Sequence, residues 1–168
     1  MLQKVIIKRI GEYVIRRCVK DDLEQVISIN LTTLPEHYST YFYEELLEDA
    51  PEAFIVAEID NQIVGYVMGR IEFGFSNIKF GFAKKGHIVS IAVLEGHRRK
   101  GLGSALMEEA IKGFAQRGCK EVFLEVRVSN IPAIRLYEKL GFVITARHEG
   151  YYNDGEAAYQ MSLPIPNG

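Results

Sequence analysis

A basic, glycine-rich turn between an apolar stretch and a helix-forming stretch carries the clearest chemical signal in this sequence. The turn consists of Arg98, Arg99, Lys100, Gly101, Leu102, Gly103 and Ser104. Its glycines let backbone N–H groups approach a ligand without a Cβ in the way, and the helix that follows presents partial positive charge at its N-terminus. Because three cations stand beside these amides, the turn predicts a site for a diphosphate group.

Two other phosphate-binding motifs do not fit this turn. The dinucleotide fingerprint needs a third glycine and an acidic ribose partner, and both are missing after Gly103. A Walker A motif needs a lysine after its glycines, and that residue is also missing. A solvated surface turn capped by its glycines is the alternative interpretation.

The composition is that of one ordinary globular domain. Of the 168 residues, 48% are hydrophobic and 25% are charged, which excludes a disordered, collagen-like or low-complexity chain. A net charge of −2 argues against nucleic-acid binding through a generally basic surface. No apolar run reaches the roughly 20 residues of a membrane span, and the first residues lack a signal peptide's apolar block. We therefore expect a cytoplasmic protein that contacts neither nucleic acid nor membrane.

The cysteines and the isolated histidines do not indicate a metal site. Cys18 and Cys119 lie far apart in the sequence and are expected to be buried free thiols. His37, His97 and His148 lack the spacing of metal ligands and are expected at the surface. No metal is predicted.

Hydrophobic periodicity and turn residues predict an alternation of strands and helices. Strands are expected at residues 13–17, 54–59, 63–71, 87–94, 121–126, 143–148 and 157–163. Helices are expected at residues 21–31, 39–48, 103–116 and 132–139. This order predicts a mixed α/β fold with helices packed on a central sheet.

Two segments have two interpretations each. Residues 1–12 form either an edge strand, which we favour, or a loosely held arm. Residues 73–86, rich in glycine and phenylalanine, form either a long loop or a twisted extension of the neighbouring strands.

Two ordered signatures resemble those of the GCN5-related N-acetyltransferase (GNAT) family. Arg98–Gly103 matches the family pattern Q/R-x-x-G-x-G/A, and Asn130–Phe142 matches N-x-x-A-x-x-L-Y-x-x-x-G-F. The resemblance implies the GNAT fold, a mixed and mostly antiparallel central sheet flanked by helices. It also implies acetyl-CoA as the cofactor, with CoA as the product and no metal in the reaction.

Four further segments resemble the catalytic subunits of NatA-type protein N-terminal acetyltransferases, especially archaeal ones. They are Leu34–Tyr38, Gly86–Val93, Leu124–Arg127 and Tyr151–Tyr159. The match covers about residues 13–163, so we expect residues 1–168 to form a single N-acetyltransferase domain with residues 1–12 as an extension. The implied substrate is the N-terminus of a protein or nascent chain, and an auxiliary or ribosomal partner is compatible with this.

The implied reaction is direct attack of an amine on the acetyl thioester, and this requires a base. A protein α-amino group has a pKa of about 7.7–8.0, so most of it is protonated at neutral pH. His87 and Glu125 match positions that are Tyr and His in one NatE-like subgroup, where they act through an ordered water. We hypothesise that His87 and Glu125 deprotonate the amine through water. The alternative is that both are ordinary strand residues exposed to solvent.

Further roles follow from the resemblance. Glu36 matches a glutamate near the substrate N-terminus that either holds the ammonium group or helps to deprotonate it. Tyr137 matches the tyrosine placed by the thioester sulfur, which donates a proton or a hydrogen bond to the leaving thiolate. Asn130 is expected to contact the pantetheine arm or to position the loop before the helix. Backbone groups expected to bind the pantetheine amides belong to Ile91, Ala92 and Val93, and side chains expected to line the peptide groove belong to Leu34, Tyr38, Tyr151 and Tyr152.

Each of these residues also has a structural interpretation. Glu36 could be a solvated or helix-capping carboxylate, Tyr137 a core residue and Asn130 part of an Asx turn. At the level of the whole protein, two alternatives stay open. One is a GNAT enzyme directed at a ribosomal protein or at lysine side chains, and the other is a catalytically silent CoA-binding subunit.

Overall fold

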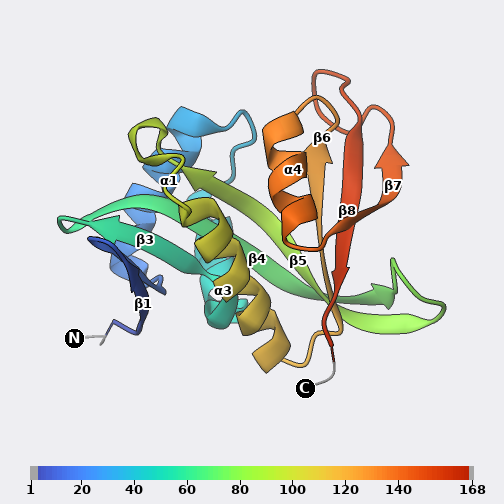
Figure 1. Cartoon of the computed structure of the whole chain (residues 1–168), viewed down its shortest axis with the longest axis horizontal. Coiled ribbons are helices and arrows are strands. Elements are labelled where there is room, and N and C mark those ends of the chain that lie inside the picture. Colours follow the sequence, from blue (N-terminus) through green and yellow to red (C-terminus); the bar gives the residue numbers. More distant parts are fainter. Residues whose placement is uncertain (1–3, 167–168) are drawn as a thin grey trace. The chain divides into compact units, whose positions relative to one another are not determined.

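The computed structural model describes residues 4–166, which form two compact units. The first unit comprises the described residues up to Arg70 together with Ile88–Arg117. The second comprises Ile71–His87 and the described residues from Gly118 onward. Strands β4 (Gln62–Phe75) and β5 (Phe82–Val93), labelled in Figure 1, each contain residues of both units.

The first unit contains an antiparallel arrangement of strands. β1 (Ile6–Ile10) pairs with β2 (Tyr13–Arg17), β2 pairs with β3 (Ile55–Ile59), and β3 pairs with β4. The edge strand expected within residues 1–12 is therefore confirmed for Ile6–Ile10, while residues 1–3 lie outside the described part. Asp60 and Asn61 form the β3–β4 turn with positive φ angles of 50° and 63°, a conformation that Asn and Asp tolerate.

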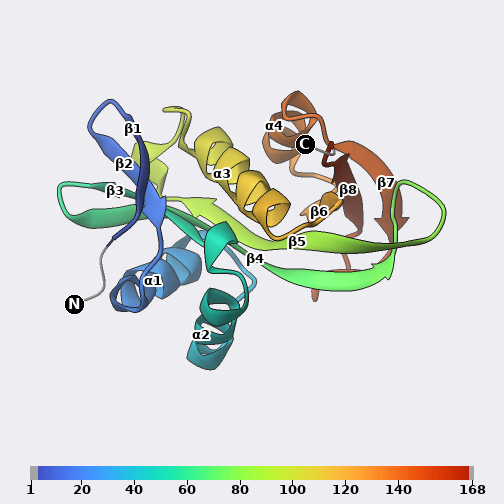
Figure 2. The same cartoon turned by 90° about the horizontal axis from the view of Figure 1, so that it is seen from below.

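Three helices cover these strands. α1 (Leu23–Thr33) and α2 (Thr40–Asp49) lie on one face, and α3 (Leu102–Gln116) lies on the other, as Figure 2 shows. Ser39 begins α2 because its hydroxyl accepts a hydrogen bond from the Phe42 N–H group, as its residue type predicts. Pro35 separates α1 from α2, because proline disfavours continuation of a helix.

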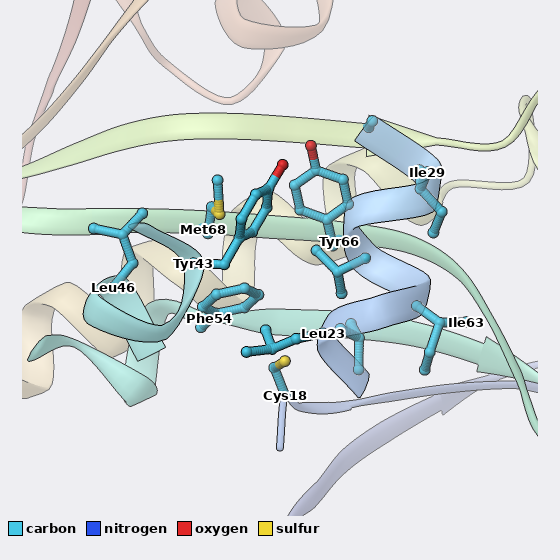
Figure 3. Close-up of a cluster of buried hydrophobic side chains, with 12 residues drawn as sticks. Cys18, Leu23, Ile29, Tyr43, Leu46, Phe54, Ile63, Tyr66 and Met68 are labelled. Atoms are coloured by element: carbon cyan, nitrogen blue, oxygen red, sulfur yellow. The ribbon is translucent and has the colours of Figure 1, made fainter. Parts of the chain in front are cut away.

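The face covered by α1 and α2 holds a large apolar cluster. Tyr43, Phe54 and Tyr66 are fully buried in it, and Figure 3 shows their rings lying between the helices and the strands. The other buried members are Cys18, Leu23, Val26, Ile29, Leu46, Val56, Ile63, Met68 and Ala92. Removal of this apolar surface from water is the main force that holds the helices on the strands.

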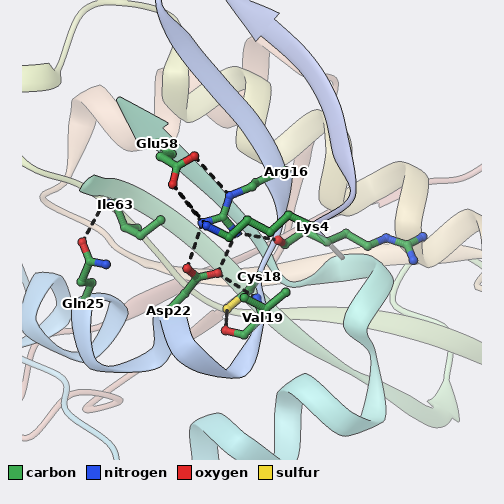
Figure 4. Close-up of polar contacts among 9 residues, drawn as sticks. Lys4, Arg16, Cys18, Val19, Asp22, Gln25, Glu58 and Ile63 are labelled. Atoms are coloured by element: carbon green, nitrogen blue, oxygen red, sulfur yellow. Dashed lines mark hydrogen bonds and ion pairs between the residues drawn. The ribbon is translucent and has the colours of Figure 1, made fainter. Parts of the chain in front are cut away.

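A buried ionic network joins β2, the short 3-10 helix Lys20–Asp22 and β3. Arg16 is 1% exposed, and its guanidinium donates two hydrogen bonds to the Asp22 carboxylate, at 2.7 and 2.9 Å. Arg16 also donates to Glu58 at 3.2 Å, and the Val19 N–H donates to Asp22 at 2.8 Å (Figure 4). Every member has several partners, which offsets the cost of burying the charges.

The second unit combines parallel and antiparallel pairing. β5 pairs in parallel with β6 (Glu121–Arg127), while β8 (Ala158–Pro164) pairs antiparallel with both β6 and β7 (Val143–His148). α4 (Ile131–Lys139) lies beside β6 and β8 (Figure 1). With the strand order β1-β2-β3-β4-β5-β6-β8-β7, the mixed, mostly antiparallel fold expected from the sequence is confirmed.

Residues 73–86 have the second of the two conformations expected from the sequence. They are not a long loop, because β4 continues to Phe75 and β5 already begins at Phe82, so the strand-extension interpretation is confirmed. The Glu121 carboxylate holds the intervening turn by accepting hydrogen bonds from the Ser76 hydroxyl at 2.5 Å and the Asn77 N–H at 2.7 Å. Phe75 and Phe82 also stack, with ring centroids 4.4 Å apart.

The expectations for the cysteines are confirmed, since Cys18 and Cys119 are both buried and free. Within residues 4–166, no helix combines the length and the apolar character needed to cross a membrane.

Gly113 provides a test of the packing of α3. A Cβ atom at this position would lie 2.0 Å from the Glu52 carbonyl oxygen, so Gly113→Ala requires the backbone to move. We expect the free energy of unfolding to fall by about 1–3 kcal/mol in a urea titration, despite alanine's higher helix propensity. At Gly96 a Cβ would meet nothing within 4 Å. The control Gly96→Ala should change stability by less than about 0.5 kcal/mol, and equal losses in both variants would contradict the prediction.

The ionic network predicts a pH-dependent stability. Burial opposes ionisation of Asp22, but hydrogen bonds from Arg16 and the Val19 N–H prevail and hold its pKa below the usual 3.8. The stability that ionised Asp22 contributes to the folded protein is fully present above pH 3.8. It is lost as the pH falls through the lower pKa of the folded state. Asp22→Asn should lower the free energy of unfolding by about 2–3 kcal/mol at pH 7. The loss is limited because Glu58 still pairs with the Arg16 guanidinium.

The measurement is urea unfolding of both proteins from pH 7 to pH 2. The stability difference between wild type and Asp22→Asn should shrink as the pH falls below the ordinary carboxyl range. Asp21→Asn is the matched control, because Asp21 is exposed and adjacent. A constant difference across the whole pH range would refute the role given to Asp22.

Candidate active site

The basic turn enters α3 in a geometry suited to an anion. Gly101 is the N-cap residue and has a φ of +79°, a conformation that glycine adopts without strain. Among the described residues, no side chain caps this helix end, so the first N–H groups of α3 lack a side-chain acceptor. Arg99 and Lys100 are exposed beside them. Amides without a side-chain acceptor and adjacent cations are a donor set that suits a diphosphate group.

The turn is anchored to the strands of its own unit. The Arg98 side chain donates to the Val93 carbonyl oxygen at 2.9 Å, and the Leu94 N–H donates to the Val64 carbonyl at 2.8 Å. The ring of His97 forms a 2.8 Å hydrogen bond with the Tyr13 hydroxyl. His97 is therefore partly exposed and hydrogen-bonded to β2.

The Leu34–Tyr38 segment is held to the first unit through its backbone. The buried Asn30 amide donates to the Glu36 carbonyl oxygen at 3.0 Å and to the Tyr66 hydroxyl at 3.2 Å. Leu34 and Tyr38 pack against the apolar cluster of Figure 3. The position of Asn30 on the apolar face of α1 was the sequence signal for such a buried polar anchor, although its partner could not be inferred.

The second unit brings His87 and Glu125 together. Nε2 of His87 lies 2.7 Å from a Glu125 carboxylate oxygen, and Nδ1 lies 2.7 Å from a carboxylate oxygen of Glu72. The ring stacks on Phe123 with the centroids 4.2 Å apart. Burial alone would lower the pKa of His87, but hydrogen bonds and charges from Glu125 and then Glu72 outweigh it and raise the pKa. The pair selected from the sequence is thus in direct contact.

Glu72 is a site residue that the sequence analysis missed. It was overlooked because it lies at the edge of a segment with an undecided conformation. Once β4 extends to Phe75, Glu72 is a strand residue whose carboxylate reaches the β5 residue His87.

Tyr137 and Asn130 lie in and before α4. Tyr137 is 7% exposed and contacts Phe142 edge to face, and burial raises its pKa to about 12. Its phenol therefore keeps its proton at neutral pH and can donate a hydrogen bond through it. The Asn130 side chain accepts a hydrogen bond from the Ala133 N–H at 3.3 Å and so caps α4. This cap is the contact that the structure assigns to Asn130.

Arg127 organises the loop that carries Tyr151 and Tyr152. Its guanidinium donates to Asp154 at 2.8 Å and to Glu156 at 2.9 Å, and it lies 4.1 Å from the centre of the Tyr152 ring. Tyr151 and Tyr152 contact each other edge to face with ring centroids 5.0 Å apart. The sequence analysis did not assign Arg127 a role, because its acidic partners lie 27 and 29 residues further along the chain.

Within the part of the chain that the structure describes, no group of three or more His, Cys, Asp or Glu side chains is arranged to hold a metal ion.

Comparison with known proteins agrees with these features. Residues 23–142 match the model described as the acetyltransferase (GNAT) family, and the chain belongs to this family. An N-alpha-acetyltransferase of Saccharolobus solfataricus is 50% identical over 157 residues, which cover 92% of this chain and 94% of that protein.

Solved structures give the same relationship. The crystal structure of Ard1 from Thermoplasma volcanium has a TM-score of 0.79 and 35% sequence identity, with 93% of this chain and 99% of that chain covered. The NatC complex bound to Gag peptide and CoA contains a chain with a TM-score of 0.82 and 26% sequence identity. The match covers 92% of this chain and 99% of that chain.

The contacts of Arg127 generate a testable prediction about the Tyr151–Tyr152 loop. Arg127→Gln removes two ion pairs and the contact with Tyr152, so chymotrypsin should cleave after Tyr151 or Tyr152 severalfold faster than in the wild type. Arg147→Gln is the matched control, because it removes an exposed ion pair with Glu149 and a contact with the Tyr159 ring on β8, both outside the Tyr151–Tyr152 pair. Identical cleavage rates in both variants would show that Arg127 does not order this loop.

Proposed function

We propose that this protein is an acetyl-CoA-dependent protein N-alpha-acetyltransferase that acetylates the free N-terminal amine of proteins by direct attack. The observation that carries this proposal is the contact of His87 with Glu125, the two side chains at the positions of the expected base. It occurs in a GNAT-family chain that is 50% identical to an N-alpha-acetyltransferase over nearly its whole length.

Acetyl-CoA supplies the activated acetyl thioester in this reaction. The turn Arg98–Ser104 binds its diphosphate through the amides at the start of α3 and the neighbouring cations. The left-handed Gly101 and the absence of a side-chain cap within the described turn support this assignment. Backbone groups of Ile91, Ala92 and Val93 bind the pantetheine amides, and Asn130 contacts the same arm.

Three side chains take part in the proton transfers of this reaction. His87 and Glu125 remove a proton from the terminal ammonium group through a water molecule, which leaves the nitrogen with the electron pair needed for attack. Tyr137 donates a proton or a hydrogen bond to the departing thiolate. Burial raises the pKa of Tyr137, so the phenol stays protonated and its O–H can donate a hydrogen bond to the thiolate as it forms.

The peptide substrate contacts another set of residues. Glu36 binds the terminal ammonium group through its carboxylate. The hydrogen bond that the Asn30 side-chain amide donates to the Glu36 carbonyl oxygen supports this by holding the segment in place. A carboxylate there disfavours acidic first residues because of like-charge repulsion. The side chains proposed to line the peptide are Leu34, Tyr38, Tyr151 and Tyr152.

We further propose that residues 1–168 form one N-acetyltransferase domain, since the family match at residues 23–142 includes parts of both compact units. The protein acts in the cytoplasm on protein N-termini or nascent chains, without direct nucleic-acid or membrane contact. An auxiliary or ribosomal partner is compatible with the proposal, as one structural neighbour belongs to the NatC complex.

The test is mass spectrometry of a mixed peptide library after incubation with acetyl-CoA. Peptides with a free α-amine should gain one acetyl group at that nitrogen, whereas peptides with a blocked α-amine and a free lysine should not react. Acetylation of lysine alone would favour a lysine-directed enzyme. CoA binding with no acetylation of any peptide would indicate a silent subunit.

Tyr137→Phe tests the proton donor in the same assay. Because the variant removes one hydroxyl from a buried ring, we expect kcat to fall by about 10²-fold or more with the fold intact. Tyr41→Phe is the control, because Tyr41 is 76% exposed on α2. An unchanged kcat for Tyr137→Phe would remove Tyr137 from the proposed reaction.

A further inference from the structure

His87 has both of its ring nitrogens occupied by carboxylates. Glu72 on β4 binds Nδ1 and Glu125 on β6 binds Nε2, each at 2.7 Å. The proposed reaction uses Glu125 but leaves Glu72 without a task. The side chains of His87 and Glu125 are each 13% exposed and that of Glu72 is 31% exposed, so this is a largely buried arrangement with one partly solvated end.

The chemistry of imidazole makes this arrangement selective for a protonated ring. A neutral imidazole has one N–H donor and one lone pair, whereas an imidazolium has two N–H donors. A neutral ring here would direct its lone pair at a carboxylate oxygen. Contacts of 2.7 Å are typical of charge-assisted N–H to carboxylate bonds, so each carboxylate favours the bound proton on His87.

We propose that Glu72 is a positioning residue for the acetyl transfer: it holds the ring of His87 opposite Glu125 and makes that ring a stronger base toward the terminal ammonium group. This inference rests on the proposed function. The raised pKa of His87 agrees with it, and both carboxylates contribute to the increase.

The increase in base strength has a purpose that follows from the substrate. An unperturbed imidazole has a pKa of about 6.5 and the α-amine one of about 7.7–8.0, so an ordinary histidine is a poor acceptor for this proton. A general base works best when its pKa approaches that of the group it deprotonates and the operating pH. Both carboxylates raise the pKa of His87 toward that of the amine, and a single carboxylate would raise it less.

The proton balance of the step is simple. An N–H bond of the ammonium group breaks and its electron pair stays on nitrogen, while the proton passes to a water molecule. That water gives up another proton to the Glu125 carboxylate, which transfers it to the lone pair of Nε2 on a neutral His87 ring, whose one proton is on Nδ1 before the step. Glu72 meanwhile keeps its bond to the proton on Nδ1 and gains no proton itself.

Other charged groups near the ring do not replace Glu72. On β5, the Lys85 ammonium lies 4.9 Å from the centre of the Phe123 ring and donates to the Phe75 carbonyl. On β6, Glu121 accepts hydrogen bonds from the turn at residues 76–77. On β8, the residue paired with Glu125 is the uncharged Gln160. Glu72 is therefore the second carboxylate at the His87 ring in the described structure.

The first measurement is the titration of the His87 ring by NMR, without substrate. In the wild type His87 should titrate at a higher pH than histidine in an unstructured peptide. In Glu72→Gln its midpoint should move to lower pH, because the side-chain amide lacks the negative charge. Glu72→Asp retains the charge on a shorter side chain, and its midpoint should lie between the two.

The second measurement is the pH dependence of kcat for a free N-terminal peptide. In Glu72→Gln the rising limb of the kcat profile should move to lower pH, because the His87 ring then loses its proton at a lower pH. The plateau should fall about tenfold, since a weaker base accepts the proton less readily, while KM for acetyl-CoA stays unchanged. Glu149→Gln, an exposed glutamate of the same unit, should change neither the titration nor the profile.

The outcomes separate this inference from the proposed function. An unshifted His87 midpoint in an active Glu72→Gln enzyme overturns the role of Glu72 alone. A loss of activity with an unmoved pH profile indicates a merely structural role and also overturns it. Absence of acetylation by the wild type overturns the proposed function, and the catalytic purpose of Glu72 with it. A wild-type midpoint no higher than that of a free peptide contradicts the inference even if the variants fail to fold.

Discussion

The parallel register between β5 and β6 is the constraint on which the contact of His87 with Glu125 depends. This register sets His87 against Phe123, and Glu125 follows two residues later on the same face of the strand. Successive strand residues point to opposite faces, so a shift of one residue would move Glu125 away from the ring. The stacking of His87 on Phe123 and the bond to Glu125 thus have one common origin in backbone pairing.

Buried polar groups hold the segments that hydrophobic packing alone would leave adjustable. Asn30 ties the Leu34–Tyr38 segment to Tyr66, whose hydroxyl is bonded in turn to Ser90 at 2.7 Å. Arg16 plays a similar part between β2 and β3. Apolar contacts are nondirectional, whereas a buried hydrogen bond weakens when its geometry changes. These networks therefore determine where a loop sits on the core.

Much of the fold could be predicted because local signals were strong and mutually consistent. Ser39 and Asn130 are helix-capping types and cap α2 and α4, and Gly118 has the positive φ expected after α3. The failures have one physical cause, which is that the deciding partner is distant in sequence. Glu121 holds the turn at residues 76–77 from more than 40 residues away, and Tyr13 binds His97 across 84 residues.

The sequence by itself determined the elements, the glycine-rich entrance to α3 and the residue types at His87, Glu125 and Tyr137, because periodicity, capping and turn preferences act over a few residues. Only the tertiary structure decided that β4 extends far enough to bring Glu72 to the second nitrogen of His87. It also decided that Arg127 holds the Tyr152 loop. Side-chain contacts across strands depend on register and burial, which are settled when distant segments pair and exclude water together.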